Sequence, residues 1–311
     1  MMQRSGRSAV AFAVMAGLMW APHFHAVEGL RAGPAGVPPL VAQFYLVVWA
    51  AAGLMLLLLL SGRFAELSVF DRRETSFLVL AALGGYAFWM LRAVALEGAA
   101  ASRARLFFSL APVLIGLFSL SGRERADGRA FLGALLGFGG CIMLVRGAGG
   151  AGDGGSWLSN LPAVAAAACW ALFSLTARPV VREEKALPMA AILLSVGAVC
   201  LFVTCLARGD GIFHIGLRQL GRTVPVGFFT VGLMLVFWLK CLSNASAAAA
   251  APLWYLGLLF SVLGRALLAG GLFAGFWWFL GGTVLILWGM RRALSGRTAR
   301  EVTIGDIIRG G

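Results

Sequence analysis

The chain has 311 residues, of which 60% are hydrophobic and only 13% are charged, and its mean hydropathy is +0.88. A water-soluble domain cannot bury this much apolar surface, so the composition excludes a soluble protein and predicts one embedded in a lipid bilayer. The net charge of +13 is spread over short loops between apolar segments, which indicates a role in membrane topology and not a nucleic-acid partner.

Ten apolar segments follow one another along the chain, each long enough to cross about 30 Å of hydrocarbon at about 1.5 Å per residue. We predict transmembrane helices over residues 8–27, 39–61, 76–96, 98–120, 129–146, 157–177, 187–207, 223–242, 245–263 and 271–290. Arg4 and Arg7 before the first segment also fit a secretory signal peptide. A similar segment recurs in mid-chain, however, so we retain the first one as a helix of an all-α polytopic membrane protein.

Three pairs of similar segments indicate an internal duplication. AVMAGLMWA at Ala13–Ala21 and AVAAAACWA at Ala163–Ala171 share five of nine residues. Gly133 and Gly140 recur 149 residues later as Gly282 and Gly289, and the Ala-rich residues 97–105 resemble 243–251. Two similar halves in an apolar chain are typical of secondary transporters. We therefore predict a first five-helix repeat over 1–147, a Gly-rich linker over 148–156, a second repeat over 157–290 and a C-terminal tail over 291–311.

The distribution of basic residues predicts the orientation. With the N-terminus in the cytoplasm, seventeen Lys and Arg residues lie on the cytoplasmic side and nine on the other side. Because cytoplasmic loops are enriched in Lys and Arg, this bias predicts that both termini and the tail are cytoplasmic. Each half has an odd number of helices, so the second half is expected to be inverted relative to the first.

Aromatic residues within the helices are candidates to line a solute pathway. Trp20 and Trp170 occupy equivalent positions in the two repeats, so we expect them to face each other across the pseudo-twofold axis. Four further candidates lie within predicted helices: Tyr86, Trp89, Trp238 and Tyr255. The alternative is that these rings only pack between helices, as most aromatic residues in a bundle do.

Charged residues inside apolar segments are costly, by about 2.5–3.5 kcal/mol at the bilayer centre, and need a reason. Arg92, Arg103 and Arg105 lie near the outer ends of the third and fourth segments, with Glu97 as counter-charge. They either snorkel to the headgroups or face the pathway, and Arg103 and Arg105 are about 200° apart, so one of them should point inward. A positive outer mouth favours an anionic or zwitterionic solute. Lys240 is the rough repeat equivalent of Arg92, or merely a cytoplasmic anchor.

His23 and His25 are two residues apart on one predicted helix and therefore point in different directions, so we predict no metal site there. His23 is a candidate solute contact or proton-responsive group, unless it simply hydrogen-bonds to its neighbours. The five cysteines lie in apolar segments without metal-ligand spacing or a disulfide pattern.

The region from Ala95 to Gly147 resembles the EamA-type signature of the drug/metabolite transporter superfamily. An Ala/Ser-rich helix entry precedes Pro112, the pair Glu124–Arg125 follows in a loop, and a helix with spaced glycines closes the half. In the second half, residues 169–179 and 250–264 are similar. Gln43 or Phe44 stands where the family often has Arg. The resemblance implies ten helices, two inverted EamA repeats and alternating access around a central cavity.

We therefore predict a multi-pass protein of the cell inner membrane that transports a small molecule, such as an amino acid, an organic acid or an amphipathic compound. Export is implied by the resemblance alone. The sequence lacks phosphate-loop, HExxH, GxSxG and CxxC motifs, so we expect neither a cofactor nor an enzyme. The alternatives are a non-transporting membrane sensor or assembly subunit and, less favoured, an intramembrane enzyme. The sequence leaves the oligomeric state and the solute open.

Overall fold

The structure is a computed structural model that describes residues 2–31, 36–68, 70–98, 101–121, 128–148, 157–268 and 275–295. Helices dominate these residues, and no strand occurs among them, which confirms the all-α prediction. Nine described segments have the length and hydropathy of membrane-spanning helices: Arg7–Leu30, Pro39–Leu60, Arg72–Glu97, Arg103–Leu120, Gly128–Gly147, Leu158–Ala177, Ala186–Arg208, Leu217–Asn244 and Ala247–Leu267. The last helix, Phe276–Leu294, packs along one of them and gives a tenth long element.

The helices of the first half begin and end at residues that disfavour a continuing helix. They are α1 (Met2–Arg31), α2 (Pro39–Leu60), the short η1 (Phe64–Ser68), α3 (Arg72–Gly98), α4 (Ala101–Phe108), α5 (Ala111–Ser121) and α6 (Gly128–Gly147). Pro39 starts α2, where a missing N–H costs nothing, and Gly62 follows its end at a φ of 67°. The predicted helix 98–120 is two helices, because Pro112 cannot continue the hydrogen bonding of α4 and instead opens α5.

The second half is more interrupted. Its elements are η2 (Trp157–Asn160), α7 (Leu161–Ala177), α8 (Ala186–Arg208), η3 (Ile212–His214), α9 (Leu217–Val226), η4 (Gly227–Leu233), α10 (Met234–Asn244), α11 (Ala247–Ala250), η5 (Ala251–Trp254), α12 (Tyr255–Leu268) and α13 (Phe276–Leu294). Segment η4 is a π-helix that begins two residues after Pro225, which lacks the N–H that a regular helix would use there. Pro252 likewise lies at the change from α11 to η5. The predicted helices 223–242 and 245–263 are therefore compound, and residues 271–274 of the last one lie outside the described residues.

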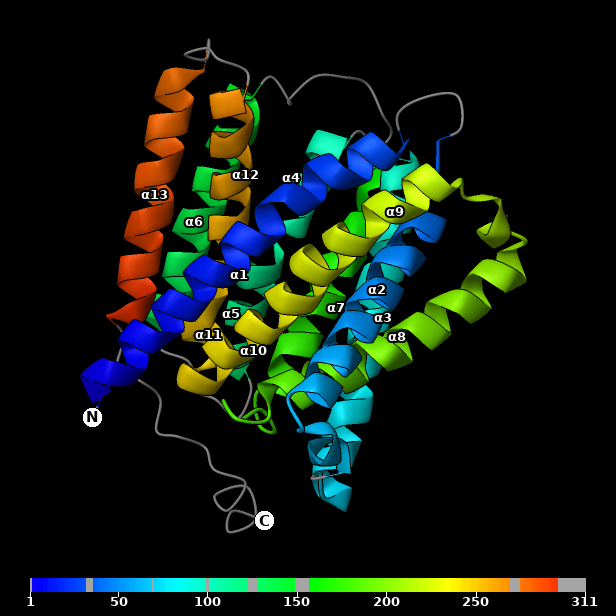
Figure 1. The fold of residues 1–311 in the computed structure, drawn as a ribbon. Coiled ribbons are helices and arrows are strands. Elements are labelled where there is room, and N and C mark those ends of the chain that lie inside the picture. The colour runs from blue at the N-terminus through cyan, green and yellow to red at the C-terminus, as the bar shows by residue number, and fades with distance from the viewer. Residues whose placement is uncertain are drawn as a thin grey trace.

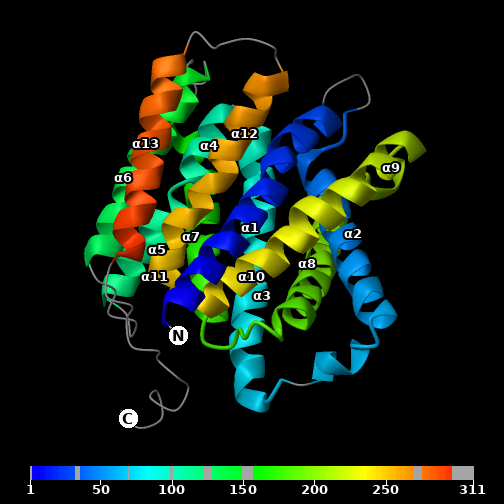
Figure 2. The same ribbon diagram turned by 60° about the vertical axis from the view of Figure 1, so that its left-hand side comes forward.

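Helices from the two halves lie side by side throughout the bundle. Extensive contacts join α6 with α13, α2 with α8, α3 with α7, and α1 with both α10 and α12 (Figure 1). The view in Figure 2 shows α13 and α6 along one edge and α2 and α8 towards the other. Helix α1 begins on the side of the bundle where α13 ends, as an even number of crossings requires (Figure 1).

The recurring glycines mark the closest approach between two helices. A Cβ on Gly140 would lie 2.5 Å from the carbonyl oxygen of Gly282, and a Cβ on Gly282 would lie 2.7 Å from the carbonyl oxygen of Gly140. Gly133 and Gly289 approach each other in the same reciprocal way. Without side chains at these positions, the backbones of α6 and α13 come into direct contact, which is how helices associate in lipid.

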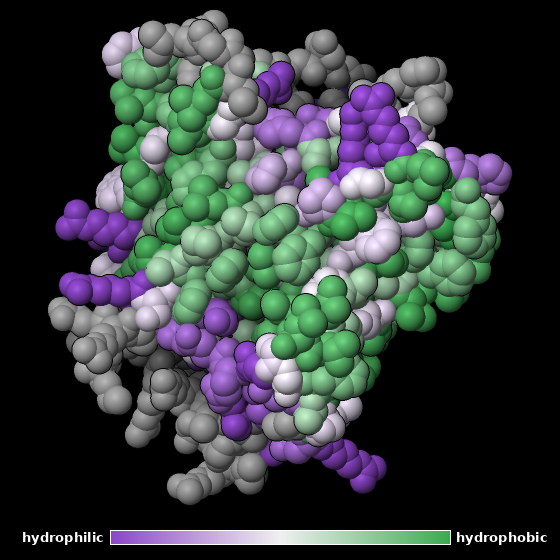
Figure 3. Space-filling model, viewed as in Figure 1, coloured by the Kyte–Doolittle hydropathy of each residue, from purple (hydrophilic) through white to green (hydrophobic). Residues whose placement is uncertain are grey.

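Apolar side chains cover the outside of the bundle at mid-height. Exposed examples near the middle of four different helices are Leu83, Leu135, Val199 and Val284. Figure 3 shows hydrophobic residues across the middle of one face, with hydrophilic residues mainly towards its upper and lower ends. This distribution fits a protein whose belt is solvated by lipid tails.

Candidate functional site

Five tryptophans from different helices converge in the centre of the bundle. We call them the tryptophan cluster: Trp20 on α1, Trp89 on α3, Trp170 on α7, Trp238 on α10 and Trp254 in η5. Four of them are at most 4% exposed, and Trp254 is half-buried. Neighbouring ring centroids lie 4.5–6.5 Å apart, which is the range of favourable aromatic contacts.

Trp20 and Trp170 meet through two other rings. Trp254 lies 5.6 Å from Trp20 and 4.5 Å from Trp170, and Trp89 lies 5.8 Å and 6.5 Å from the same two rings. The two repeat-related tryptophans thus belong to one cluster in which Trp89 and Trp254 contact both of them, whereas the sequence predicted only that the two rings face each other. Trp254 was not among the predicted site residues, and no repeat signal singled it out.

The cluster leaves little free volume in this conformation. A cavity of about 20 Å³ lies beside it, which is room for about one water molecule. Its lining includes Trp20, Phe108, Arg105 and Trp254. A second gap, between Trp20, Trp238 and Gly257, is too narrow for water. Both of these gaps are too small for a molecule of metabolite size.

Arg92 is buried next to the cluster, with 1% of its surface exposed. Its Nη1 donates a hydrogen bond of 2.9 Å to Oε1 of Gln43 on α2. Its guanidinium carbon lies 5.2 Å from the ring centroid of Trp20, 5.7 Å from that of Phe24 and 5.6 Å from that of Phe108. Each such cation–π contact contributes about 0.5–2 kcal/mol, so the rings offset part of the cost of burying the charge. The snorkelling alternative is therefore wrong for Arg92.

His23 is also fully buried, and its environment determines where the ring carries its proton. The hydroxyl of Thr230 donates to the carbonyl oxygen of Val226 at 2.7 Å, so its oxygen must accept the 2.9 Å hydrogen bond from Nδ1 of His23. Neutral His23 then carries a lone pair at the buried Nε2, for which the described part of the chain supplies no hydrogen-bond donor. The His23 ring stacks on Trp20 at 4.4 Å.

The π-helix η4 brings Thr230 to this position. Gly227 at its start lies against the carbonyl of Leu46 on α2, where any side chain would collide. π-Helical turns are rare and often occur at functional sites, because the extra residue per turn shifts the following side chains. Gln43 and Thr230 are thus site residues that sequence reasoning missed. Gln43 was noted only at a position where the family often has Arg, and Thr230 lies in no motif. Only the folded chain places them beside Arg92 and His23.

The arginines at the proposed outer end differ from each other. Arg105 forms an ion pair with Glu28, and its guanidinium lies 5.3 Å from the ring centroid of Phe24. It lines the small cavity, whereas Arg103 is half-buried and is not part of that lining. Since Glu28 neutralises Arg105, the net positive charge at the predicted outer mouth is smaller than three arginines would give. Glu97 pairs with Arg208, at 3.1 Å.

The remaining predicted site residues have other surroundings. His25 contacts Ser261, at 3.2 Å, and the described residues contain no group that could hold a metal ion. The hydroxyl of Tyr86 lies 2.6 Å from the hydroxyl of Thr204. Tyr255 donates to the carbonyl of Ala134 on α6 at 2.8 Å and borders the small cavity with its ring. Lys240 lies over Phe12, 5.3 Å from its centroid.

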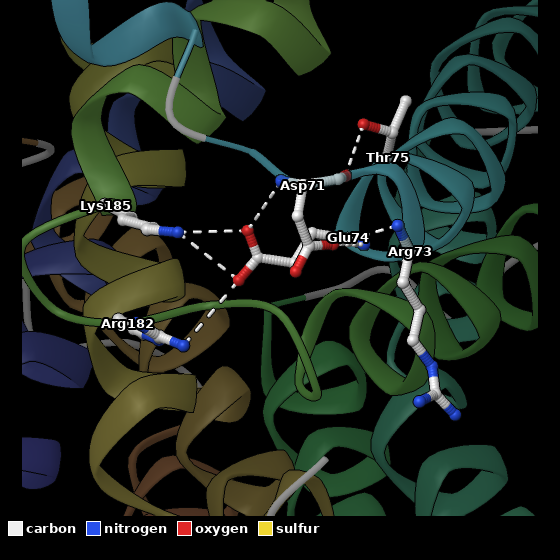
Figure 4. A network of polar contacts seen from close by, with 6 residues as sticks. All are labelled: Asp71, Arg73, Glu74, Thr75, Arg182 and Lys185. Carbon is white, nitrogen blue, oxygen red and sulfur yellow. Dashed lines mark hydrogen bonds and ion pairs between the residues drawn. The ribbon is translucent and has the colours of Figure 1, made fainter.

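A polar network lies at the start of α3, at the end of the bundle where α1 begins (Figure 1), and Figure 4 shows its contacts. Glu74 near the start of α3 is only 3% exposed. It accepts from Lys185, which precedes α8, at 3.0 Å, and lies 3.8 Å from Arg182. The backbone N–H of Asp71 also donates to it, at 3.2 Å. Nearby, Arg63 pairs with Glu66 and donates to the carbonyl of Glu184. These contacts tie the loop between α2 and α3 to the loop between α7 and α8.

Residues 7–146, which cover α1 to α6, match the model of the EamA-like transporter family. The first half of the chain is therefore similar to this family. Among solved structures, 22 chains match significantly. One of them, a crystal structure described as "Crystal structure of protein", is 21% identical, with a TM-score of 0.75 over 92% of this chain and 97% of the other. At that identity the likeness concerns the fold. No curated protein sequence matches the chain significantly.

Proposed function

We propose that this EamA-like protein is a secondary transporter of a small metabolite that works by alternating access between two inverted repeats. The observation that supports this most is the exchange of helix partners between the halves. The proposed repeats make α1 correspond to α7, α3 to α9–α10, and α4–α5 to α11–α12. Under this correspondence, the packing of α3 against α7 is equivalent to the packing of α10 against α1, and both contacts are present. Likewise, the contacts of α4 and α5 with α7 become those of η5 and α12 with α1.

Two helix pairs map onto themselves in this exchange. These are α2 with α8 and α6 with α13, and the second pair contains the reciprocal contacts between Gly133 and Gly289 and between Gly140 and Gly282. A twofold axis between the halves, lying in the membrane plane, would produce this pattern. It favours the division into repeats at 1–147 and 157–290. The linker 148–156 and the tail 291–311 lie largely outside the described residues.

The contacts at the two ends fit an occluded stage of such a cycle. One end is tied by Glu74 to Lys185, and the other by Arg105 to Glu28 and by Arg208 to Glu97. The tryptophan cluster fills the space between them. Alternating access requires that each end can open while the other stays closed, so these ion pairs are the contacts expected to break in turn. Opening the end at Glu74 to the cytoplasm and exporting the solute agree with the orientation predicted from basic residues and with the family resemblance.

The test is a reversible lock. In a variant with the five native cysteines replaced by alanine, Glu74→Cys and Lys185→Cys are introduced together, with each single variant as control. We expect an oxidised double variant to lose export and a reductant to restore it. The solutes are found by comparing metabolites inside and outside cells with and without the gene. If no metabolite changes its distribution and the lock changes nothing, the protein is a non-transporting sensor or assembly subunit.

A further inference from the structure

Arg92 is a buried positive charge without a buried negative charge beside it. In the part of the chain that the structure describes, no carboxylate lies within ion-pair distance of its guanidinium, and its hydrogen bond goes to the neutral Gln43. Other buried charges differ: Glu74 has Lys185, and Arg105 has Glu28. Buried charges in proteins are normally paired, so the surroundings of Arg92 lack an anion.

The polar side-chain atoms of Arg92 and Gln43 that make no hydrogen bond to the described residues are hydrogen-bond donors. An arginine can only donate, so Gln43 must turn its oxygen towards Arg92 and its NH2 group away from it. The Nε2 of Gln43 and the Nε of Arg92 are both buried, and neither has a hydrogen-bond partner among the residues that the structure describes. A group that satisfies both atoms must therefore be an acceptor.

Apolar rings surround these donors and connect them to the central cavity. Trp20, Phe24 and Phe108, whose rings contact Arg92, all line the 20 Å³ cavity as well. Only these rings thus separate the guanidinium from the free volume of the cavity. Arg105 also lines this cavity, but its charge is already neutralised by the ion pair with Glu28.

We propose that Arg92 and Gln43 form the recognition site for the carboxylate of a monoanionic solute whose apolar body lies against Trp20 and Phe108. A planar guanidinium next to an amide matches the two oxygens of a carboxylate. The single uncompensated positive charge of Arg92 balances one negative charge. A phosphate monoester carries nearly two negative charges, so Arg92 would leave part of its charge unbalanced. This inference rests on the proposed transport function, because it names the class of solute that this function would move.

The test measures binding to the purified full-length protein in nanodiscs without a gradient, through quenching of tryptophan fluorescence excited at 295 nm. Three probes share a phenyl ring: phenylacetate carries a negative charge, 2-phenylethylamine a positive charge and 2-phenylethanol none. We expect saturable binding of phenylacetate at least tenfold tighter than that of either other probe. Arg92→Gln should reduce this preference to about one.

Two further variants separate the site from general effects. The double variant Arg63→Gln/Glu66→Gln removes an ion pair of zero net charge outside the cavity lining and should leave the preference for phenylacetate unchanged. Gln43→Leu keeps the charge of Arg92 but removes the amide, and it should weaken phenylacetate binding at least threefold with little effect on 2-phenylethanol. It also tests the proposal if Arg92→Gln does not fold, which thermal unfolding of each variant would reveal.

The proposal is wrong if wild-type protein binds phenylacetate and 2-phenylethanol alike or binds neither, or if folded Arg92→Gln and Gln43→Leu both keep the wild-type preference. A failure of the transport proposal looks different. Carboxylate binding that depends on Arg92, in a protein that moves no solute, would support the site and refute the transporter. Transport without any dependence on Arg92 would refute only the site.

Discussion

The buried hydrogen bond between His23 on α1 and Thr230 in the π-helical turn η4 joins the two halves of the bundle at 2.9 Å. Because Thr230 donates to Val226, it can only accept from the imidazole, and the contact fixes one tautomer of His23. A structural irregularity in the second half therefore sets the chemistry of a side chain in the first half. The helices that carry these residues pack along each other.

Replacing Thr230 with valine should destabilise the protein by about 1–3 kcal/mol, because valine has the same shape but leaves Nδ1 of His23 buried without an acceptor. Thr230→Ser keeps the hydroxyl and serves as the control, with a smaller loss from the missing methyl group. Thermal unfolding in the same detergent measures both. Equal unfolding temperatures for wild type and Thr230→Val would show that the hydrogen bond contributes nothing to stability.

The glycine contact between α6 and α13 gives a second prediction. Gly140→Ala would place a methyl group 2.5 Å from the carbonyl oxygen of Gly282, so the helices must separate. We expect a loss of about 1–3 kcal/mol, as is typical of overpacked positions. The neighbouring Gly139→Ala is a matched control, because the nearest atom to its new Cβ would be 4.0 Å away. Similar unfolding temperatures for the two variants would contradict this packing.

The tryptophan cluster predicts that Trp20 and Trp170 are reached by water only in another conformation. Both are at most 4% exposed, and the adjacent cavity holds about one water molecule. In a cysteine-free background, Trp20→Cys and Trp170→Cys should react with a small water-soluble thiol reagent in an open state. A disulfide between cysteines introduced at positions 74 and 185 should change the rate of this reaction at both positions. Complete protection in all conditions would mean that both rings serve packing alone.

The function of these two rings is tested with alanine and phenylalanine. Trp→Ala at a buried position costs about 3–5 kcal/mol, so a loss of transport in that variant has to be compared with its expression level. Trp20→Phe and Trp170→Phe keep an aromatic ring and most of the packing. We expect the alanine variants to transport poorly at normal expression and the phenylalanine variants to retain part of the activity. Normal transport by both alanine variants would exclude the cluster from the pathway.

Much of the fold could be predicted because lipid imposes a simple rule on the sequence. Apolar length gave the helices, and the repeated Trp and Gly positions indicated which elements correspond. The breaks near Pro112 and Pro225 have local causes, but the π-helical form of η4 depends on the close contact of Gly227 with α2. The pairings of Arg92 with Gln43 and of Arg105 with Glu28 join residues far apart in the chain. Helical periodicity could show that the arginines point apart, but not which one meets a carboxylate.

Topology gives the last prediction, because it decides which end of the bundle is which. Helix α1 begins and α13 ends on one side, and Gly62 lies at that end, whereas Gly211 follows α8 at the opposite end (Figure 1). The bias of seventeen basic residues to nine predicts that the first of these ends is cytoplasmic. Cysteines introduced singly at Gly62 and Gly211 in the cysteine-free background should therefore differ in intact cells. A membrane-impermeant thiol reagent should label position 211 from outside and label position 62 only after the membrane is opened. The reverse pattern would invert the protein, and labelling of both positions from outside would contradict the arrangement of the helices between them.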